Sequence, residues 1–154
     1  MKKLIILGIV AIAFSCKVDD PFVDRIVSPV LVIFESAGVA TNGLTTEPSV
    51  SSSAAADATI TLKLLELDKS GLLDNKVGID SLPAASVPVI IKFRNGTKVA
   101  EGTTDAKGKL VLTTTWKAMG VATPEAGKSS VLLAASASYK NVPFTKLFRL
   151  TASK

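Results

Sequence analysis

The sequence predicts an all-β fold, a mainly antiparallel β-sandwich of seven strands. Several segments alternate apolar and polar residues with the two-residue period of a strand, and Gly, Asn, Asp and Pro separate these segments at short intervals. Successive segments follow one another through tight turns, so most strand pairs should be antiparallel. We expect the strands at 29–35, 58–67, 87–94, 97–104, 109–116, 129–140 and 142–152.

Before the first strand, residues 1–15 have the parts of a secretory signal peptide. Two lysines, Lys2 and Lys3, precede an apolar run that is too short for a bilayer span, which takes about 20 apolar residues. The ending Ala13-Phe14-Ser15-Cys16 resembles a bacterial lipobox. That resemblance implies cleavage before Cys16 and attachment of lipid, palmitate included, to this residue. A free or buried thiol is the alternative for the only cysteine in the chain.

Residues 16–28 are polar and lack periodicity, which predicts a tether between the lipid and the folded domain. Just after the cysteine, Lys17, Asp19 and Asp20 look like the signal that sends Bacteroidota lipoproteins to the cell surface. This resemblance implies a lipid-anchored protein of the outer membrane that faces the cell exterior. An ordinary charged tether is the alternative.

The first expected strand opens at Pro29, a position where a missing N–H is tolerated. It is apolar on both faces, because Leu31 and Ile33 alternate with a second apolar set. That second set consists of Val30, Val32 and Phe34. A lone sandwich covers one face of a strand, so we expect this set, or the sheet edge that the strand completes, to pack against a partner protein.

The segment 36–57 is rich in Ser, Ala, Thr and Gly, and we interpret it as a long loop or linker. It offers the alternative to a partner, because it could fold back over the first strand. In 58–67, Ile60, Leu62 and Leu64 share a face, but Leu65 and the residues after it reverse the phase. We therefore expect a β-bulge there, since one extra residue restores the alternation.

The segment 68–86 is expected to be a second long loop. The next strand, 87–94, is followed by Asn95-Gly96, which predicts a two-residue type I′ hairpin turn with positive φ at both positions. The return strand ends before the turn 105–108, where Asp caps its own backbone and Gly supplies a positive φ. In the strand that follows, Trp116 is expected in the core.

The last two strands form a hairpin through Asn141. Its inner face is expected to carry Val131, Leu133, Phe148 and Leu150. The basic residues that cluster here could guard a sheet edge against strand addition or, as the alternative, bind an anionic partner. They are Lys140, Lys146, Arg149 and Lys154.

Two stretches resemble bacterial immunoglobulin-like domains of the invasin and intimin type. These are Val87-Pro88-Val89 and the run from Ala100 to Leu110, AEGTTDAKGKL, which contains the turn motif of those domains. The resemblance covers residues 58–152 and implies an Ig-like β-sandwich, which we place at 29–154. It implies little about activity, because this sandwich hosts many functions.

Composition excludes several kinds of chemistry. The chain has no histidine, so it has no Ser-His-Asp triad and no histidine metal ligand. Its net charge of +5 falls to about +3 without Lys2 and Lys3, and the basic residues are scattered, which does not indicate nucleic-acid binding. Calcium held by Asp68, Asp74 and Asp80 is an alternative to a solvated loop.

The sequence therefore predicts a non-enzymatic surface lipoprotein without a cofactor. We expect it to be an accessory or structural subunit that binds an outer-membrane protein, for example a nutrient importer. The alternative is a carbohydrate-binding or adhesive module, although aromatic residues make up only 5% of the chain. A hydrolase would need a cleft around paired acids, and Glu101 and Asp105 lie at opposite ends of one short hairpin.

Overall fold

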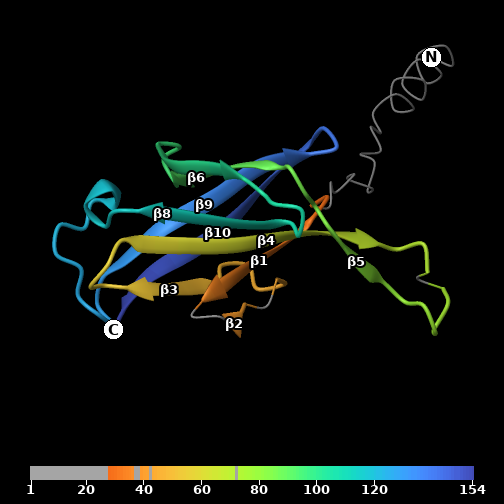
Figure 1. Ribbon diagram of the computed structural model, residues 1–154, viewed down its shortest axis with the longest axis horizontal. Coiled ribbons are helices and arrows are strands. Elements are labelled where there is room, and N and C mark those ends of the chain that lie inside the picture. The colour runs from red at the N-terminus through yellow and green to blue at the C-terminus, as the bar shows by residue number, and fades with distance from the viewer. Residues whose placement is uncertain (1–27, 37–38, 42, 72) are drawn as a thin grey trace, which may run out of the picture.

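The computed structural model of the chain describes residues 28–154 except 37–38, 42 and 72. This part of the chain is all-β, with ten strands and one 3-10 turn, η1 (Lys117–Met119). No helix among the described residues is long and apolar enough to cross a membrane. The strands form two five-stranded sheets that lie face to face in a sandwich-like arrangement (Figure 1), so the predicted all-β class is confirmed.

The first sheet is built around one long strand, β4, which pairs antiparallel with β1, β5 and β8. A short strand, β2, extends this sheet beside the end of β1. The members of the first sheet are β1 (Leu31–Ser36), β2 (Val39–Ala40), β4 (Ala58–Asp68), β5 (Asp80–Pro83) and β8 (Lys109–Thr114).

The second sheet has the strand order β3-β10-β9-β6-β7. All its pairs are antiparallel except the pair of β3 with β10, which is parallel. The members of the second sheet are β3 (Ser49–Ser53), β6 (Pro88–Phe93), β7 (Lys98–Thr103), β9 (Ser130–Tyr139) and β10 (Val142–Ser153).

The core lies between the sheets and takes one face of each long strand. On β4, the alternate residues Ile60, Leu62 and Leu64 are buried, as their spacing predicts. The rings of Phe34 and Phe148 meet across the layers with centroids 4.4 Å apart. Trp116 is buried as predicted, and its indole N–H donates to the Ser53 carbonyl at 3.0 Å.

The seven predicted strands all occur, but the count is wrong, because the described residues form ten strands. The additional strands β2, β3 and β5 lie in the segments 36–57 and 68–86 that were expected to be loops. The predicted bulge in β4 is also wrong. The register of β4 is continuous against its partners, so Leu65 faces away from the core instead of being shifted back toward it.

The hairpin after β6 differs from the prediction as well. Of the two predicted turn residues, Gly96 has a positive φ, of 94°, and Asn95 does not. The Phe93 N–H donates to the Thr97 carbonyl at 2.8 Å, which closes a three-residue loop. The pairing with β7 accordingly shifts register at Ile91/Lys92. Two consecutive positive φ values occur instead at Lys140 (50°) and Asn141 (65°), in the two-residue turn between β9 and β10.

Candidate partner-binding surface

The residues predicted to anchor and address the protein lie outside the described part of the chain. These are Cys16, Lys17, Asp19 and Asp20. Lipidation and export to the surface therefore stay predictions. The described chain begins at Ser28, and the candidate surface is built from the elements around that point.

The predicted partner strand is in the structure a core strand. The three side chains expected to meet a partner are buried between the sheets, with Val30 4%, Val32 5% and Phe34 0% exposed. Gly43 covers part of the opposite face, since a Cβ on it would lie 2.7 Å from Leu31 Cδ1. The alternative, in which 36–57 folds back over the strand, therefore holds at this point, and a partner could reach β1 only along its edge.

That edge of β1 is open over part of its length. Phe34 donates its N–H to Thr41 Oγ1 at 3.1 Å, and its carbonyl accepts the Thr41 N–H at 2.7 Å. Backbone groups alternate in direction along a strand, so those of Val32 point to the same side. β2 pairs only with the end of β1, and no other strand of the described chain lies beside Val32 on this side.

β10 has an open edge of the same kind in the second sheet. Its last third is covered by β3, where the Arg149 N–H donates to the Pro48 carbonyl at 2.9 Å. The backbone groups of Thr145 and Leu147 point the same way, but β3 does not extend this far. Pro143 has no N–H to offer at this edge, which limits uncontrolled strand addition at its outer end.

The two open edges border one hollow of about 540 Å³ between the sheets. Apolar side chains dominate its wall, with lysines at the rim. The lining residues are Ser28, Pro29, Val30, Leu31, Val32, Gly43, Leu44, Leu67, Lys69, Phe144, Thr145 and Lys146. Such a hollow can receive aliphatic side chains while the edges bind an extended backbone.

Lys146 closes part of this opening from inside. It lies on the same face of β10 as Phe144 and Phe148, and its ammonium reaches out to the crossing segment 43–45. There Nζ donates to the carbonyls of Gly43 at 3.2 Å and Thr45 at 2.5 Å. The lysine that interrupts the apolar pattern therefore fixes the crossing segment across the mouth of the hollow.

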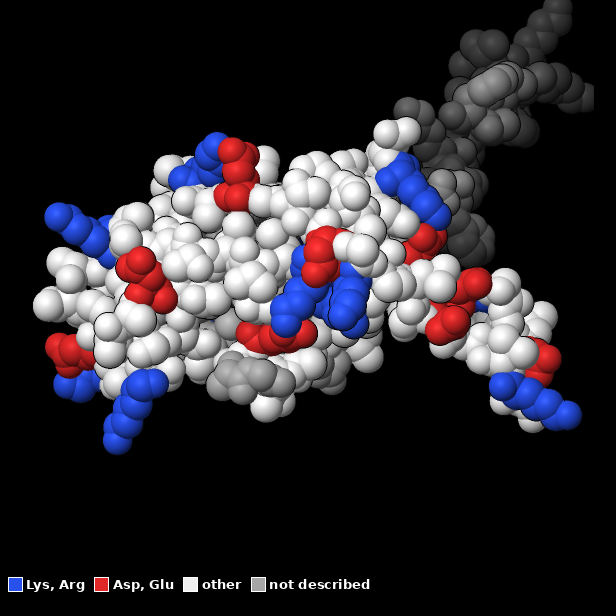
Figure 2. Space-filling view, viewed as in Figure 1, with Lys and Arg blue, Asp and Glu red and all other residues white. Residues whose placement is uncertain are grey.

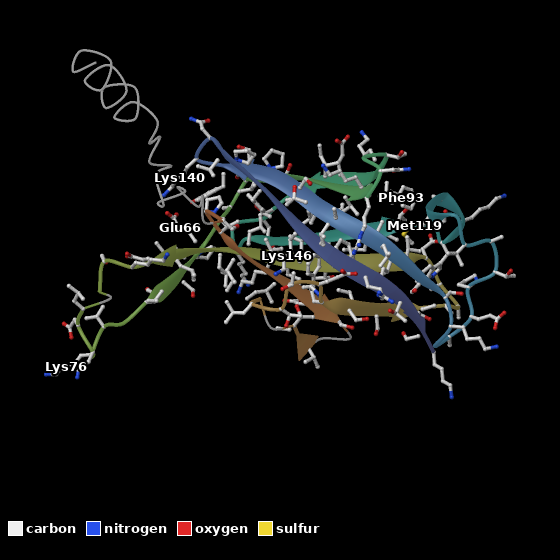
Figure 3. All side chains as sticks on the ribbon, turned by 180° about the vertical axis from the view of Figure 1, so that it is seen from behind. Glu66, Lys76, Phe93, Met119, Lys140 and Lys146 are labelled. Carbon is white, nitrogen blue, oxygen red and sulfur yellow. The ribbon has the colours of Figure 1, made fainter. Side chains whose placement is uncertain are left out.

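Glu66 lies where β4 leaves the core, next to Leu67 in the wall of the hollow. It accepts hydrogen bonds from Lys140 Nζ and, at 2.7 Å, from the Tyr139 hydroxyl, and Figure 3 shows the Lys140 and Glu66 side chains close together. The hydrogen bond from Lys140, followed by that from Tyr139, lowers the pKa of Glu66. The hydrogen bonds to Glu66 raise the pKa of Tyr139 and of Lys140, so at neutral pH the Tyr139 hydroxyl keeps its proton while Glu66 and Lys140 form an ion pair.

Beyond Glu66, β4 and β5 continue as a hairpin arm that leaves the body of the sandwich (Figure 1). We use the name arm for residues 67–83. Several of its large aliphatic side chains are exposed, among them Leu73 (100%), Val77 (64%) and Ile79 (49%). The interpretation of 68–86 as a loop missed β5 and did not single out these residues, and no periodicity within 69–79 marks them.

The acidic residues of the arm hold turns. Oδ1 of Asp68 accepts the Ser70 N–H, Oδ1 of Asp74 accepts the Lys76 N–H, and each bond measures 2.9 Å. Within the described chain, no group of three acidic or thiol side chains is placed to bind a metal ion. Figure 2 shows basic and acidic side chains interspersed over the face that it draws, which gives no single-sign patch there.

A second hollow of about 490 Å³ lies on the second sheet, over β6, β7 and β9. Its lining includes Glu101, Thr103, Ser136 and Ser138, but no aromatic ring. Glu101 and Asp105 form no acid–base pair, because Glu101 binds Lys98 at 3.1 Å and Asp105 accepts backbone N–H groups of its own turn.

Comparison of the chain with protein-family models, curated proteins and solved structures found no match.

Proposed function

We propose that the protein is a non-enzymatic lipoprotein of the outer membrane, anchored through Cys16 and displayed on the cell surface, where it serves as an accessory or structural subunit of an outer-membrane protein assembly. The sequence of residues 1–20 supports the anchor and the address. A nutrient importer is the host that this address suggests.

We also propose that the domain is Ig-like. In that fold the first, second and fifth strands share one layer, and the third, sixth and seventh share the other. The strands β1, β4 and β8 in one sheet, with β6, β9 and β10 in the other, support this division. β7 departs from it, because it pairs with β6 in the second sheet and not with β8 in the first.

The observation that carries the proposed binding function is the hollow between the open edges of β1 and β10. An extended segment of a partner could add to β10 through the backbone groups of Thr145 and Leu147 and place alternate aliphatic side chains into the hollow. Main-chain hydrogen bonds would give affinity, and the hollow would select the side chains.

The test is purification of the lipidated protein from membranes in detergent, followed by identification of the proteins that come with it. We expect Thr145→Pro to remain folded and anchored, because its N–H faces the open edge, and to lose its partner. Thr145→Val controls for the lost hydroxyl contact with Ser136 at 2.8 Å. Thr113→Pro, at an exposed position of β8, is the matched proline control.

If Thr145→Pro keeps the partner at the level of Thr113→Pro, strand addition at β10 is wrong. The anchor is tested separately with Cys16→Ser, which should release the protein from the membrane, because one acyl chain gives only marginal binding and none gives no anchor. A Cys16→Ser variant found in the outer membrane at the normal level would contradict the lipoprotein assignment.

The carbohydrate-binding or adhesive alternative would use the second hollow, which offers hydroxyl and carboxylate groups but no ring for stacking. Retardation of the purified protein in glycan-containing gels, without any partner, would favour that function over the accessory role.

A further inference from the structure

The arm carries four exposed large aliphatic residues that the fold does not explain. Leu73, Val77, Ile79 and Leu82 are all at least 44% exposed, and they follow one another along one projecting hairpin. Large apolar side chains gathered on one exposed element often mark a contact surface. We call the described residues 69–71 and 73–79 the arm tip.

The arm tip has a defined conformation. The Asp74 N–H donates to the Gly71 carbonyl, and the Gly78 N–H donates to the Asp74 carbonyl, each at 2.9 Å. Val77 packs against Gly71 so closely that a Cβ there would lie 2.4 Å from Val77 Cγ1. The turn therefore presents Leu73 to solvent by construction, and Figure 3 shows Lys76 at the far end of the arm.

The arm projects from the end of the sandwich at which the described chain begins. Leu31 pairs with Leu65, and β4 then runs on past the start of β1 toward the arm. Ser28 and Lys69 line the same hollow. The arm tip thus lies on the side of the domain from which the chain leads back to Cys16.

The lengths are compatible with contact between the arm tip and a membrane. The twelve residue steps from Cys16 to Ser28 can span at most about 40 Å when fully extended. The chain between Asp68 and Asp80 has eleven residues, so the arm can project beyond its strands by at most about 20 Å, half of this length fully extended. The tether is therefore long enough for the arm tip to reach the bilayer that holds the lipid.

We propose that the arm tip rests in the surface of the bilayer to which Cys16 is anchored, with Leu73, Val77 and Ile79 among the headgroups and upper acyl chains. This inference rests on the proposed lipid anchor. Aliphatic side chains at an interface bury apolar area at shallow depth, and Lys69 and Lys76 can extend their ammonium groups back to water. The described arm tip has no Trp, Tyr or Arg, the residues that dominate protein–protein hot spots.

Two contacts with the membrane would fix the orientation of the domain. With the lipid alone, the domain could turn freely about its tether. With the arm tip seated as well, the hollow between β1 and β10 lies close to the bilayer, because Leu67 and Lys69 of the arm line this hollow. A membrane protein beside the domain could then add an extended segment to the edge of β10, which the two membrane contacts already hold in a fixed orientation.

The experiment uses the full lipidated protein in vesicles of phosphatidylethanolamine and phosphatidylglycerol. With Cys16 blocked by lipid, Leu73→Cys supplies the free thiol for an environment-sensitive fluorophore. Lys117→Cys on η1, an exposed position, is the matched control. We expect the label at 73 to shift to the blue and to be quenched by spin-labelled lipid, and the label at 117 to do neither. Adding Ile79→Asp should abolish the shift at 73.

Flotation of the vesicles separates this inference from the proposed function. Protein that does not float with the vesicles would show that the lipid anchor is wrong. Protein that floats while the label at 73 stays in water would overturn the membrane contact alone. A shift at 73 in native outer-membrane vesicles but not in protein-free vesicles would assign the arm tip to a partner protein and would likewise overturn the lipid proposal.

Discussion

The body of the sandwich and the arm carry similar aliphatic residues in opposite surroundings, although a single strand, β4, runs through both. Leu62 and Leu64 in the body are at most 1% exposed, whereas Ile79 and Leu73 in the arm are 49% and 100% exposed. The difference arises at Glu66, the next inward position after Leu64, where the opposite sheet ends in the β9–β10 turn. Alternation places a side chain on a face, but only a second layer buries it.

From this comparison we expect the body to supply the stability of the fold and the arm to serve as a contact surface. The largest expected effect follows from removing an aromatic side chain of the core. Phe148→Ala removes a fully buried side chain that packs on Phe34, and we expect it to lower the free energy of unfolding by about 3–5 kcal/mol. Leu73→Ala, its counterpart in the arm, should change it by no more than about 0.5 kcal/mol. Urea unfolding measures both, and equal losses would contradict the division.

The next largest effect compares two glycines with positive φ. Gly108 in the body has φ of 69°, and a Cβ on it would lie 2.5 Å from the Leu64 carbonyl oxygen. Gly78 in the arm has φ of 67° with open space around it. Alanine at either position should cost about 1–3 kcal/mol of backbone strain.

Gly108→Ala should cost about 1–3 kcal/mol more than Gly78→Ala, because β4 must also move away from the new methyl group. Thermal unfolding of both variants gives the comparison. Equal losses would show that the approach of the 105–108 turn to β4 is not close in solution.

A smaller effect concerns a buried hydroxyl that joins the chain after the arm to the body. Thr104 Oγ1 accepts the Val87 N–H at 2.9 Å and donates to the Ala84 carbonyl at 2.8 Å, while the residue is 4% exposed. Thr104→Val leaves both groups without this partner and should cost about 1–3 kcal/mol. Thr103→Val, on an exposed neighbour, should be close to neutral in the same unfolding assay.

Prediction from the sequence succeeded for strands whose apolar–polar alternation is followed directly by turn residues. It failed for strands that form only by pairing with segments far away in the sequence. The seven long strands and most of their inward residues follow from alternation alone. The strands β2, β3 and β5 have little periodicity of their own, and they form because β1, β10 and β4 offer open edges to them.

The candidate site shows the same limit. Val32 and Phe34 were assigned to a partner because their strand is apolar on both faces, but the opposite sheet buries them and Gly43 lies on the other face. Because these side chains are core residues, substitutions at Val32 and Phe34 would destabilise the fold and could not report on a partner. The hollow and its two open edges arise from residues more than a hundred positions apart, such as Gly43 and Lys146, and no local pattern reveals them.

The smallest expected effect lies at Glu66, the joint between body and arm, and depends on pH. Its pKa is lowered in the folded protein, mainly by the hydrogen bond from Lys140 and then by that from Tyr139. A carboxyl whose pKa is lowered by folding stabilises the protein above its unfolded pKa, and this contribution is lost as the pH falls through the folded value.

Glu66→Gln should therefore melt slightly below the wild type at neutral pH, and the gap should close as the pH falls from the ordinary glutamate value near 4.5 into the acid range. Tyr139→Phe removes the lesser contact and leaves Lys140 in place, so its gap should be smaller and should close over the same range. Melting temperatures measured from neutral to acid pH test both variants. A difference in melting temperature between Glu66→Gln and the wild type that stays constant over this pH range would contradict the prediction. It would mean that Glu66 joins the arm to the β9–β10 turn as a polar group and not as a charge, so that acid would leave this contact in place.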